Sequence, residues 1–291
     1  MADMGLTEVQ ATVQETVSSM VQEYLIQESV LIPLVMAIPT QPGEDRVKIP
    51  RSGDDFTADT KAENTSLTAQ TLLYTTDDLL LDKHKAVQVR VEDRANVQSM
   101  IALVSDIVPR MAKTLALDID TSIVTELELA SAAAPDHRLA YDNATSLGKT
   151  DLLNARVLIH QQNLRFNECF IGVSPQSESN LLAIDDFVHV DKYGATASGL
   201  VNGELGRLYG ARVVMSNEFD DAKTVIWHPS ACAFARQINP LFEDDRDVPN
   251  LATLYSLSHL YGAKVLDAGV RQVFLGTATY EDNTGSPFAD F

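Results

Sequence analysis

The feature that most constrains the fold of this sequence is a long apolar stripe between Ala95 and Ala130. Its apolar residues are three or four positions apart, the period of one helix face, and they are Val97, Ile101, Val104, Val108, Met111, Leu115, Ile119, Ile123 and Leu127. At about 1.5 Å per residue, this helix would be on the order of 50 Å long. Pro109 interrupts the pattern and predicts a kink, or a break at Val108.

The segments before this helix are polar and extended. "RVKIPR" (46–51) and "KAVQVRVED" (85–93) alternate like strands, and about thirty mostly polar residues lie between them. Because loops of this length are uncommon in compact domains, we predict a long hairpin-like excursion with a specific task. Residues 7–27 carry an apolar stripe behind a capping box formed by Thr7 and Gln10, which predicts a helical arm lying on another surface.

Residues 150–275 have the pattern of a mixed α/β unit. Helices are predicted after Asp151, from Pro175 and, as the short helix "SACAFAR", after Pro229. "CFIGVS", "ARVVMS" and "TVIWH" are typical of buried strands, and two further strand-like runs follow "NPLFEDDRDVPN" (239–250), which we interpret as a charged loop. Residues 131–150 also have the composition of a loop.

The charge of the chain limits its partners. It has 22 Lys and Arg against 41 Asp and Glu, a net charge of −19, and residues 1–45 contain seven acids and no Lys or Arg. Such a surface repels phosphate, so sequence-specific nucleic-acid binding is not expected, although a protein that merely encloses nucleic acid is compatible. Without a signal peptide or an apolar span of about 18 residues, we predict a cytoplasmic chain with no membrane span. Cys169 and Cys232 lie in apolar runs and are predicted to be buried free thiols.

We find no motif for catalysis, a cofactor or a metal. Gly203, Gly206 and Gly210 are spaced G-x-x-G-x-x-x-G, which is neither a dinucleotide loop nor a P-loop and predicts tight turns around a short helix. The closest two of the six histidines are 23 residues apart, and the acid doublets lie in polar segments typical of solvated loops. The protruding arm and excursion cannot bury themselves, so the chain is predicted to self-assemble.

The glycine-rich region also carries a family resemblance. "FIGVSPQSESNLLAIDDFVHVDKYGATASGLVNGELGRLYGARVVMSN" (170–217) resembles the major capsid proteins of tailed double-stranded DNA bacteriophages with the Hong Kong 97 fold. The family pattern N-G-x-[IL]-G-x-x-x-G-x-x-V-x-x-S is matched by Asn202, Gly203, Leu205, Gly206, Gly210, Val213 and Ser216. "RFNE" (165–168) replaces the family's usual Pro and Gly-Arg, and the Pro after "SNEF" (216–219) is absent.

The resemblance implies an α+β capsid fold with five parts. They are an N-terminal arm (1–40), an extended loop with its return strand (41–94), a peripheral domain with a spine helix (95–149), an axial domain (150–255), and return strands with a tail (256–291). Gly194, Asn202, Gly203, Gly206 and Gly210 would then shape turns near the axes where subunits meet.

The resemblance further implies a structural virion protein that forms pentamers and hexamers of an icosahedral shell around DNA, assembled in the host cytoplasm. A separate scaffolding protein, a portal and a decoration protein are implied partners, with no cofactor. The scarce cations Arg46, Arg51, Lys61, Arg90 and Arg94 are candidates for ion pairs between subunits, with solvated surface charge as the alternative. Lys48 and Lys61 are located where some relatives have a lysine that crosslinks covalently to asparagine.

Two alternatives remain at this stage. An encapsulin-like shell around an enzyme would use the same fold, and it would hold a cargo protein instead of a genome. An α/β enzyme acting through Asp185, Asp186, His189 and Asp191 would form a small discrete oligomer and would lose activity when His189 is replaced by Ala.

Overall fold

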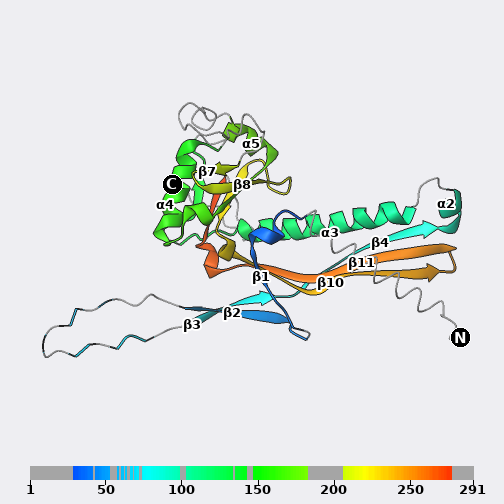
Figure 1. The fold of residues 1–291 in the computed structure, drawn as a ribbon, viewed down its shortest axis with the longest axis horizontal. Helices are drawn as coiled ribbons and strands as arrows, with labels where there is room; N and C mark the ends of the chain where they lie inside the picture. The colour runs from blue at the N-terminus through cyan, green and yellow to red at the C-terminus, as the bar shows by residue number, and fades with distance from the viewer. Residues whose placement is uncertain are drawn as a thin grey trace.

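The computed structural model describes residues 29–41, 43–52, 74–98, 103–133, 135–142, 147–182 and 206–276, with isolated residues between 58 and 71. Their strands form sheets of four, six and two strands. Figure 1 shows an elongated molecule in which a long helix and the four-stranded sheet extend together from the six-stranded sheet, while the two-stranded hairpin points the opposite way.

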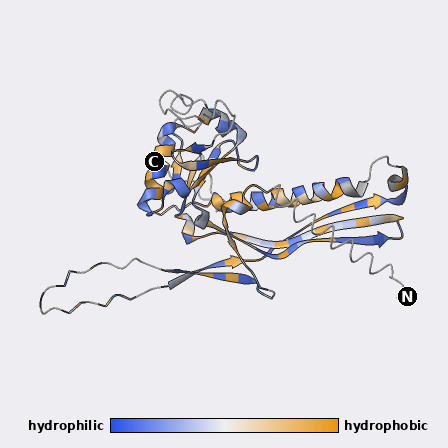
Figure 2. Ribbon diagram, in the orientation of Figure 1, coloured by the Kyte–Doolittle hydropathy of each residue, from blue (hydrophilic) through white to orange (hydrophobic). Residues whose placement is uncertain are grey.

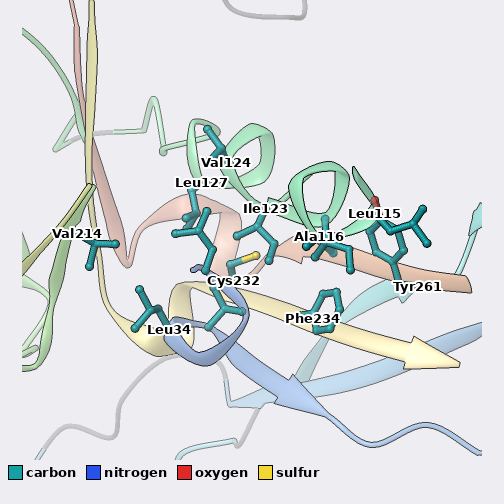
Figure 3. Close-up of a cluster of buried hydrophobic side chains, with 14 of the residues drawn as sticks. Leu34, Leu115, Ala116, Ile123, Val124, Leu127, Val214, Cys232, Phe234 and Tyr261 are labelled. Carbon is teal, nitrogen blue, oxygen red and sulfur yellow. The ribbon is translucent and has the colours of Figure 1, made fainter. Parts of the chain in front are cut away.

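The four-stranded sheet supports the long helix. Its order is β1 (Met36–Ile38), β10 (Cys232–Asp247), β11 (Ala252–Val265) and β4 (Lys83–Glu92), the last of which confirms the alternating strand predicted from 85. The helix α3 (Leu103–Leu127) lies along one face, and its apolar side chains are buried against Phe234 and Tyr261 of the sheet (Figure 3). Leu257 of β11 belongs to the same cluster. The shorter α2 (Asp93–Gln98) follows β4 directly.

The predicted break at Val108 is wrong, because α3 runs through Pro109 without interruption. Pro109 lies near the start of the helix, where its missing N–H removes one backbone hydrogen bond. Val108 and Met111, on either side of it, are buried in the core. Packing of these side chains therefore holds the helix together across the proline.

The six-stranded sheet confirms most of the predicted α/β elements, but residues 138–140, inside the predicted loop 131–150, form one of its strands. Its order is β5 (Arg138–Ala140), β12 (Gln272–Gly276), β9 (Lys223–Trp227), β6 (Phe170–Val173), β8 (Ala211–Met215) and β7 (Arg207–Leu208). The helix α4 (Lys149–Gln161) covers one face, and α5 (Pro175–Leu182) follows β6. The other face shares the core beneath α3 through Val214, Val225 and Trp227. Short 3-10 turns are η1 (Ile32–Leu34), η2 (Phe166–Glu168), η4 (Pro229–Ala231) and η5 (Asp267–Gly269).

The predicted helix "SACAFAR" and the predicted charged loop at 239–250 are both wrong. After the short turn η4, residues 232–247 form the single strand β10, which pairs antiparallel with β11. Cys232 and Phe234 point into the core beneath α3, and the acids from Glu243 onward are mostly exposed. Exposed charged side chains are compatible with a strand when the backbone is paired with a neighbouring strand. The polar composition of this segment therefore led to the wrong prediction of a loop.

The outer edge of β10 is irregular. β1 pairs only with Ala233 to Ala235, and within the described residues β10 then has β11 as its single neighbour. The register of β10 with β11 shifts twice, between Arg236 and Ile238 and between Ile238 and Leu241, with Pro240 inside the second shift, so the backbone of β10 is irregular there. Glu243, Asp244, Asp245, Arg246 and Asp247 follow along the same edge.

The predicted excursion is a hairpin, but its second strand differs from the prediction. β2 (Arg46–Ser52) pairs antiparallel with β3 (Tyr74–Leu80), whereas the 85–93 segment belongs to the four-stranded sheet. Asp77 and Asp78 interrupt the alternation of apolar and polar residues in β3, so the sequence did not predict this strand. Leu79 and Leu81 at the base of the hairpin pack in one cluster with Ala233 and Ala235 of β10.

Both cysteines are buried and free, as predicted. Burial raises the pKa of both thiols to about 12. Because the thiolate is the reactive form, neither is expected to act as a nucleophile.

The crossing of the hairpin over β11 leads to a stability prediction. A Cβ at Gly262 would overlap the carbonyl oxygen of Leu80, which is backbone and cannot move aside easily. Gly262→Ala is therefore expected to lower the free energy of unfolding by about 1–3 kcal/mol, measured by urea denaturation. Ser258→Ala on the same strand is the control, and equal stability of the two variants would contradict the close approach.

Candidate assembly surfaces

The glycine-rich region forms a tight hairpin in its described part. Tyr209 and Gly210, both with positive φ (49° and 97°), connect β7 to β8 as a two-residue turn of the kind favoured in hairpins. Gly206, also with positive φ, accepts a hydrogen bond from the N–H of Val213 at 3.2 Å. Backbone geometry therefore accounts for Gly206 and Gly210. They shape a β-hairpin, however, and not the predicted turns around a short helix. Gly194, Asn202 and Gly203 lie outside the described residues.

Two of the candidate arginines have acidic partners in their own chain. Arg51 forms an ion pair with Asp267 and donates to Thr75 Oγ1 at 3.1 Å, so it ties the β2–β3 hairpin to η5. Arg46 lies 3.4 Å from Asp45 and 3.9 Å from Asp78, and it is about half exposed. Such exposed pairs contribute little stability.

The other three candidate cations are differently placed. Lys61, Arg90 and Arg94 are exposed, and none has an ion pair in the part of the chain that the structure describes. Arg90 projects from β4 and Arg94 from α2, at the end of the four-stranded sheet far from the six-stranded one (Figure 1). Pairing of these cations with a second subunit stays a prediction.

A buried carboxylate that we did not predict anchors the start of the described chain. Asp120 on α3 accepts hydrogen bonds from Ser29 Oγ (2.6 Å), Val30 N (3.0 Å) and Leu31 N (3.3 Å). Burial raises the pKa of Asp120, and the hydrogen bonds from Ser29 and the backbone oppose this shift. The signal in the sequence was an acid on the buried face of the helix, next to Ile119.

A second buried polar group lies between α3 and the sheet. His259 on β11 is fully buried, and neither ring nitrogen has a hydrogen-bond partner in the described structure. Its ring contacts Tyr261 edge-on at 4.8 Å between centroids, and Tyr261 donates to Asp118 Oδ2 at 2.8 Å. Burial, and then the charge of nearby Arg236, lowers the pKa of His259 to about 4.

No arrangement in the described residues suggests catalysis. No group of three or more His, Cys, Asp and Glu side chains there could hold a metal ion. No helix of the described chain is long and apolar enough to span a bilayer. Asp185, Asp186, His189 and Asp191, the residues of the enzyme alternative, lie outside the described part.

Comparison with known proteins decides the family. A family model described as phage capsid protein matches residues 76–272, from β3 to the first residue of β12. The chain belongs to this phage capsid family. It is a structural major capsid protein with the Hong Kong 97 fold that associates with itself into an icosahedral shell of the virion, and it is not an enzyme.

Solved structures agree with the family. A protein of Mycobacterium phage Che8 is 26% identical, with a TM-score of 0.65 over 84% of this chain and 86% of its own. The mature capsid of bacteriophage PhiM1 is 16% identical, with a TM-score of 0.69 over 87% and 88%. A virus-like particle from Pyrococcus furiosus is 12% identical, with a TM-score of 0.59 over 90% and 99%. The curated proteins contain no match to the chain.

The Asp120 anchor of the capsid protein can be tested by stability. Asp120→Ala removes the acceptor for Ser29 Oγ and two backbone N–H groups, so the free energy of unfolding is expected to fall by about 1–3 kcal/mol. Asp106→Ala, at an exposed ion pair of the same helix, should change it by no more than about 0.5 kcal/mol. Equal effects in chemical denaturation would show that the anchor does not matter.

His259 predicts a pH dependence of the capsid protein subunit. The folded state keeps His259 neutral down to about pH 4, while the unfolded chain binds the proton near 6.5. The contribution of neutral His259 to the free energy of unfolding is therefore fully present above about pH 6.5. On the order of 3 kcal/mol of it is lost as the pH falls to 4. Urea midpoints across this range should fall less steeply in His259→Phe than in wild type, whereas the exposed-site control His160→Gln, on α4, should match wild type. An unchanged slope in His259→Phe would refute the assignment.

Proposed function

We propose that this capsid protein forms both pentamers and hexamers of a shell that encloses packaged double-stranded DNA. The observation that carries the proposal is the match of the capsid family model together with a fold shared, over 84% of this chain, with a protein of a mycobacterial phage. The net charge of −19 fits a container wall, because an acidic surface does not adhere to the phosphates it surrounds.

The domain roles follow the architecture. We propose that α3 with the four-stranded sheet is the peripheral domain, that the six-stranded sheet is the axial domain, and that the β2–β3 hairpin belongs to the extended loop. This grouping assigns β10 to the peripheral domain, since it pairs with β11 beneath α3, whereas the sequence ranges place it in the axial domain. Residues 1–40 serve as the arm in this proposal, and its last part, β1, joins the edge of the four-stranded sheet. Residues 1–28, with the helix predicted over 7–27, lie outside the described residues.

Further partners are part of the same proposal. A separate scaffolding protein would guide closure, a portal would replace one pentamer, and a decoration protein would bind the outer surface. Assembly would take place in the host cytoplasm. Heterologous contacts between copies that fail to close produce tubes or fibres, which gives a scaffold its physical role.

A shell without a genome is the second candidate. The observation that favours it is the fold likeness to a virus-like particle from Pyrococcus furiosus, which covers 90% of this chain. This likeness, at 12% identity, concerns the fold alone, and the family match favours the phage capsid.

Particle mass and content test the proposal. The expressed protein, alone and with its neighbouring gene products, is expected to give closed shells or capsomers by light scattering and negative-stain electron microscopy. Particles purified from producing cells should contain nuclease-protected DNA. A monodisperse monomer or dimer under all conditions would contradict the shell, and particles with a cargo protein and no DNA would favour the second candidate.

A further inference from the structure

Two arginines lie opposite each other on the edge hairpin of the six-stranded sheet. β7 is the last strand of that sheet, and Arg207 on β7 pairs in register with Arg212 on β8. Both side chains are exposed, whereas Leu208 and Ala211, the next pair along, are buried beneath α4. The hairpin therefore holds one face in the core and presents two guanidinium groups to the exterior.

This arrangement is unfavourable for the isolated chain. Like charges directly opposite each other in an antiparallel pair are destabilising. Within the described residues, neither Arg207 nor Arg212 has an ion pair, although acids outnumber cations by 41 to 22 in the sequence. Because the described residues offer these two guanidinium groups no carboxylate, an anionic group on another molecule would relieve the repulsion between them.

A matching acidic hollow lies at the other end of β8. A cavity of about 540 Å³ is lined by Pro175, Gln176, Asn217, Phe219, Asp220 and Asp221. It lies where the parallel strands β6 and β8 end, whereas the arginine hairpin lies where β8 begins. Three residues of β8, Val213 to Met215, lie between Arg212 and the end of the strand, or about 10 Å.

The two carboxylates of this hollow are largely uncompensated. Asp220 is 3.9 Å from Lys223 Nζ, which is closer to Glu128 at 3.0 Å. Asp221 has an exposed side chain with no ion pair in the described chain, and its carbonyl accepts a hydrogen bond from Ser177 Oγ at 3.3 Å. Two adjacent carboxylates in a concave site suit two guanidinium groups, which bind carboxylates through paired N–H donors.

We infer that the Arg207/Arg212 hairpin of one subunit binds the Asp220/Asp221 hollow of the next. This inference rests on the proposed shell function and specifies one of its contacts. The two surfaces lie at opposite ends of one strand, so the contact is head-to-tail, and repetition of a head-to-tail contact about an axis closes a ring. A second copy is favoured over DNA as the partner, because a chain of charge −19 repels phosphate as a whole.

Charge reversal tests the contact. Arg207→Glu with Arg212→Glu leaves a like-charge pair on the hairpin, so the thermal unfolding of the subunit should barely change, but assembly should be lost. Asp220→Arg with Asp221→Arg should also abolish assembly. The four substitutions together restore opposite charges at the contact with the net charge of wild type, and they should recover particles. Arg110→Glu with Arg165→Glu, at two exposed arginines elsewhere, makes the same charge change as the first variant and should still assemble.

Mixing the two double variants shows whether the contact is between subunits. One variant then has two acidic surfaces and the other has two basic surfaces, so each hairpin fits only the hollow of the other variant. An equimolar mixture should therefore form rings in which the two variants alternate. Alternation closes only with an even number of subunits, and the mixture should therefore give six-membered rings without five-membered ones. Native mass spectrometry and electron microscopy measure both.

Each result has a defined meaning. Normal assembly of either double variant, failure of the fourfold variant, or a mixture without rings would overturn the inference while wild-type shells leave the proposed function intact. Shells of the arginine variant that no longer retain DNA would assign the hairpin to nucleic acid instead. A wild-type chain that never assembles would refute the proposed function itself and the contact with it.

Discussion

The packing of α3 against both sheets is the interaction on which the remaining structure depends. Met111, Leu115, Ile119, Ile123 and Leu127 follow one face of the helix and are almost completely buried. Each buried side chain of this size stabilises the fold by about 1.5–3 kcal/mol. The same cluster includes Val214 and Trp227 of the six-stranded sheet, so one continuous core fixes the two sheets relative to each other. A subunit with two rigidly connected ends can define the angle at which its neighbours meet.

Buried hydrogen bonds inside this core fix positions that the hydrophobic effect alone would leave variable. Asp120 binds the backbone of residues 30 and 31, and Trp227 Nε1 donates to the carbonyl of Leu34 at 3.2 Å. Both contacts hold residues 30–34, the segment that leads into the first strand of the four-stranded sheet. Apolar packing tolerates small displacements, whereas these hydrogen bonds hold the entering chain to one position, since a buried donor without an acceptor is costly.

The sequence predicted the elements whose signals are local. The helix period of α3, the alternation in β4 and the Pro175 start of α5 each depend on neighbouring residues, and each was confirmed. β3 and β10 were missed, because their acids have the composition of a loop and their strand conformation depends on pairing with β2 and β11. The pairing of Arg207 with Arg212 becomes visible only once the turn between them is known. Asp120 was overlooked as an ordinary helix charge, although its position on the buried face was readable.

The irregular edge of β10 has a consequence for a protein made in many copies. An open strand edge can recruit the same edge of another molecule through backbone hydrogen bonds, and such growth has no natural end. The two register shifts, Pro240 and the charged run from Glu243 interrupt that backbone template along most of its length. Copies therefore have to recognise one another through side chains with fixed geometry. The irregular edge of β10 thus prevents aggregation by edge-to-edge strand pairing. Its prevention is a precondition for accurate assembly at high local concentration.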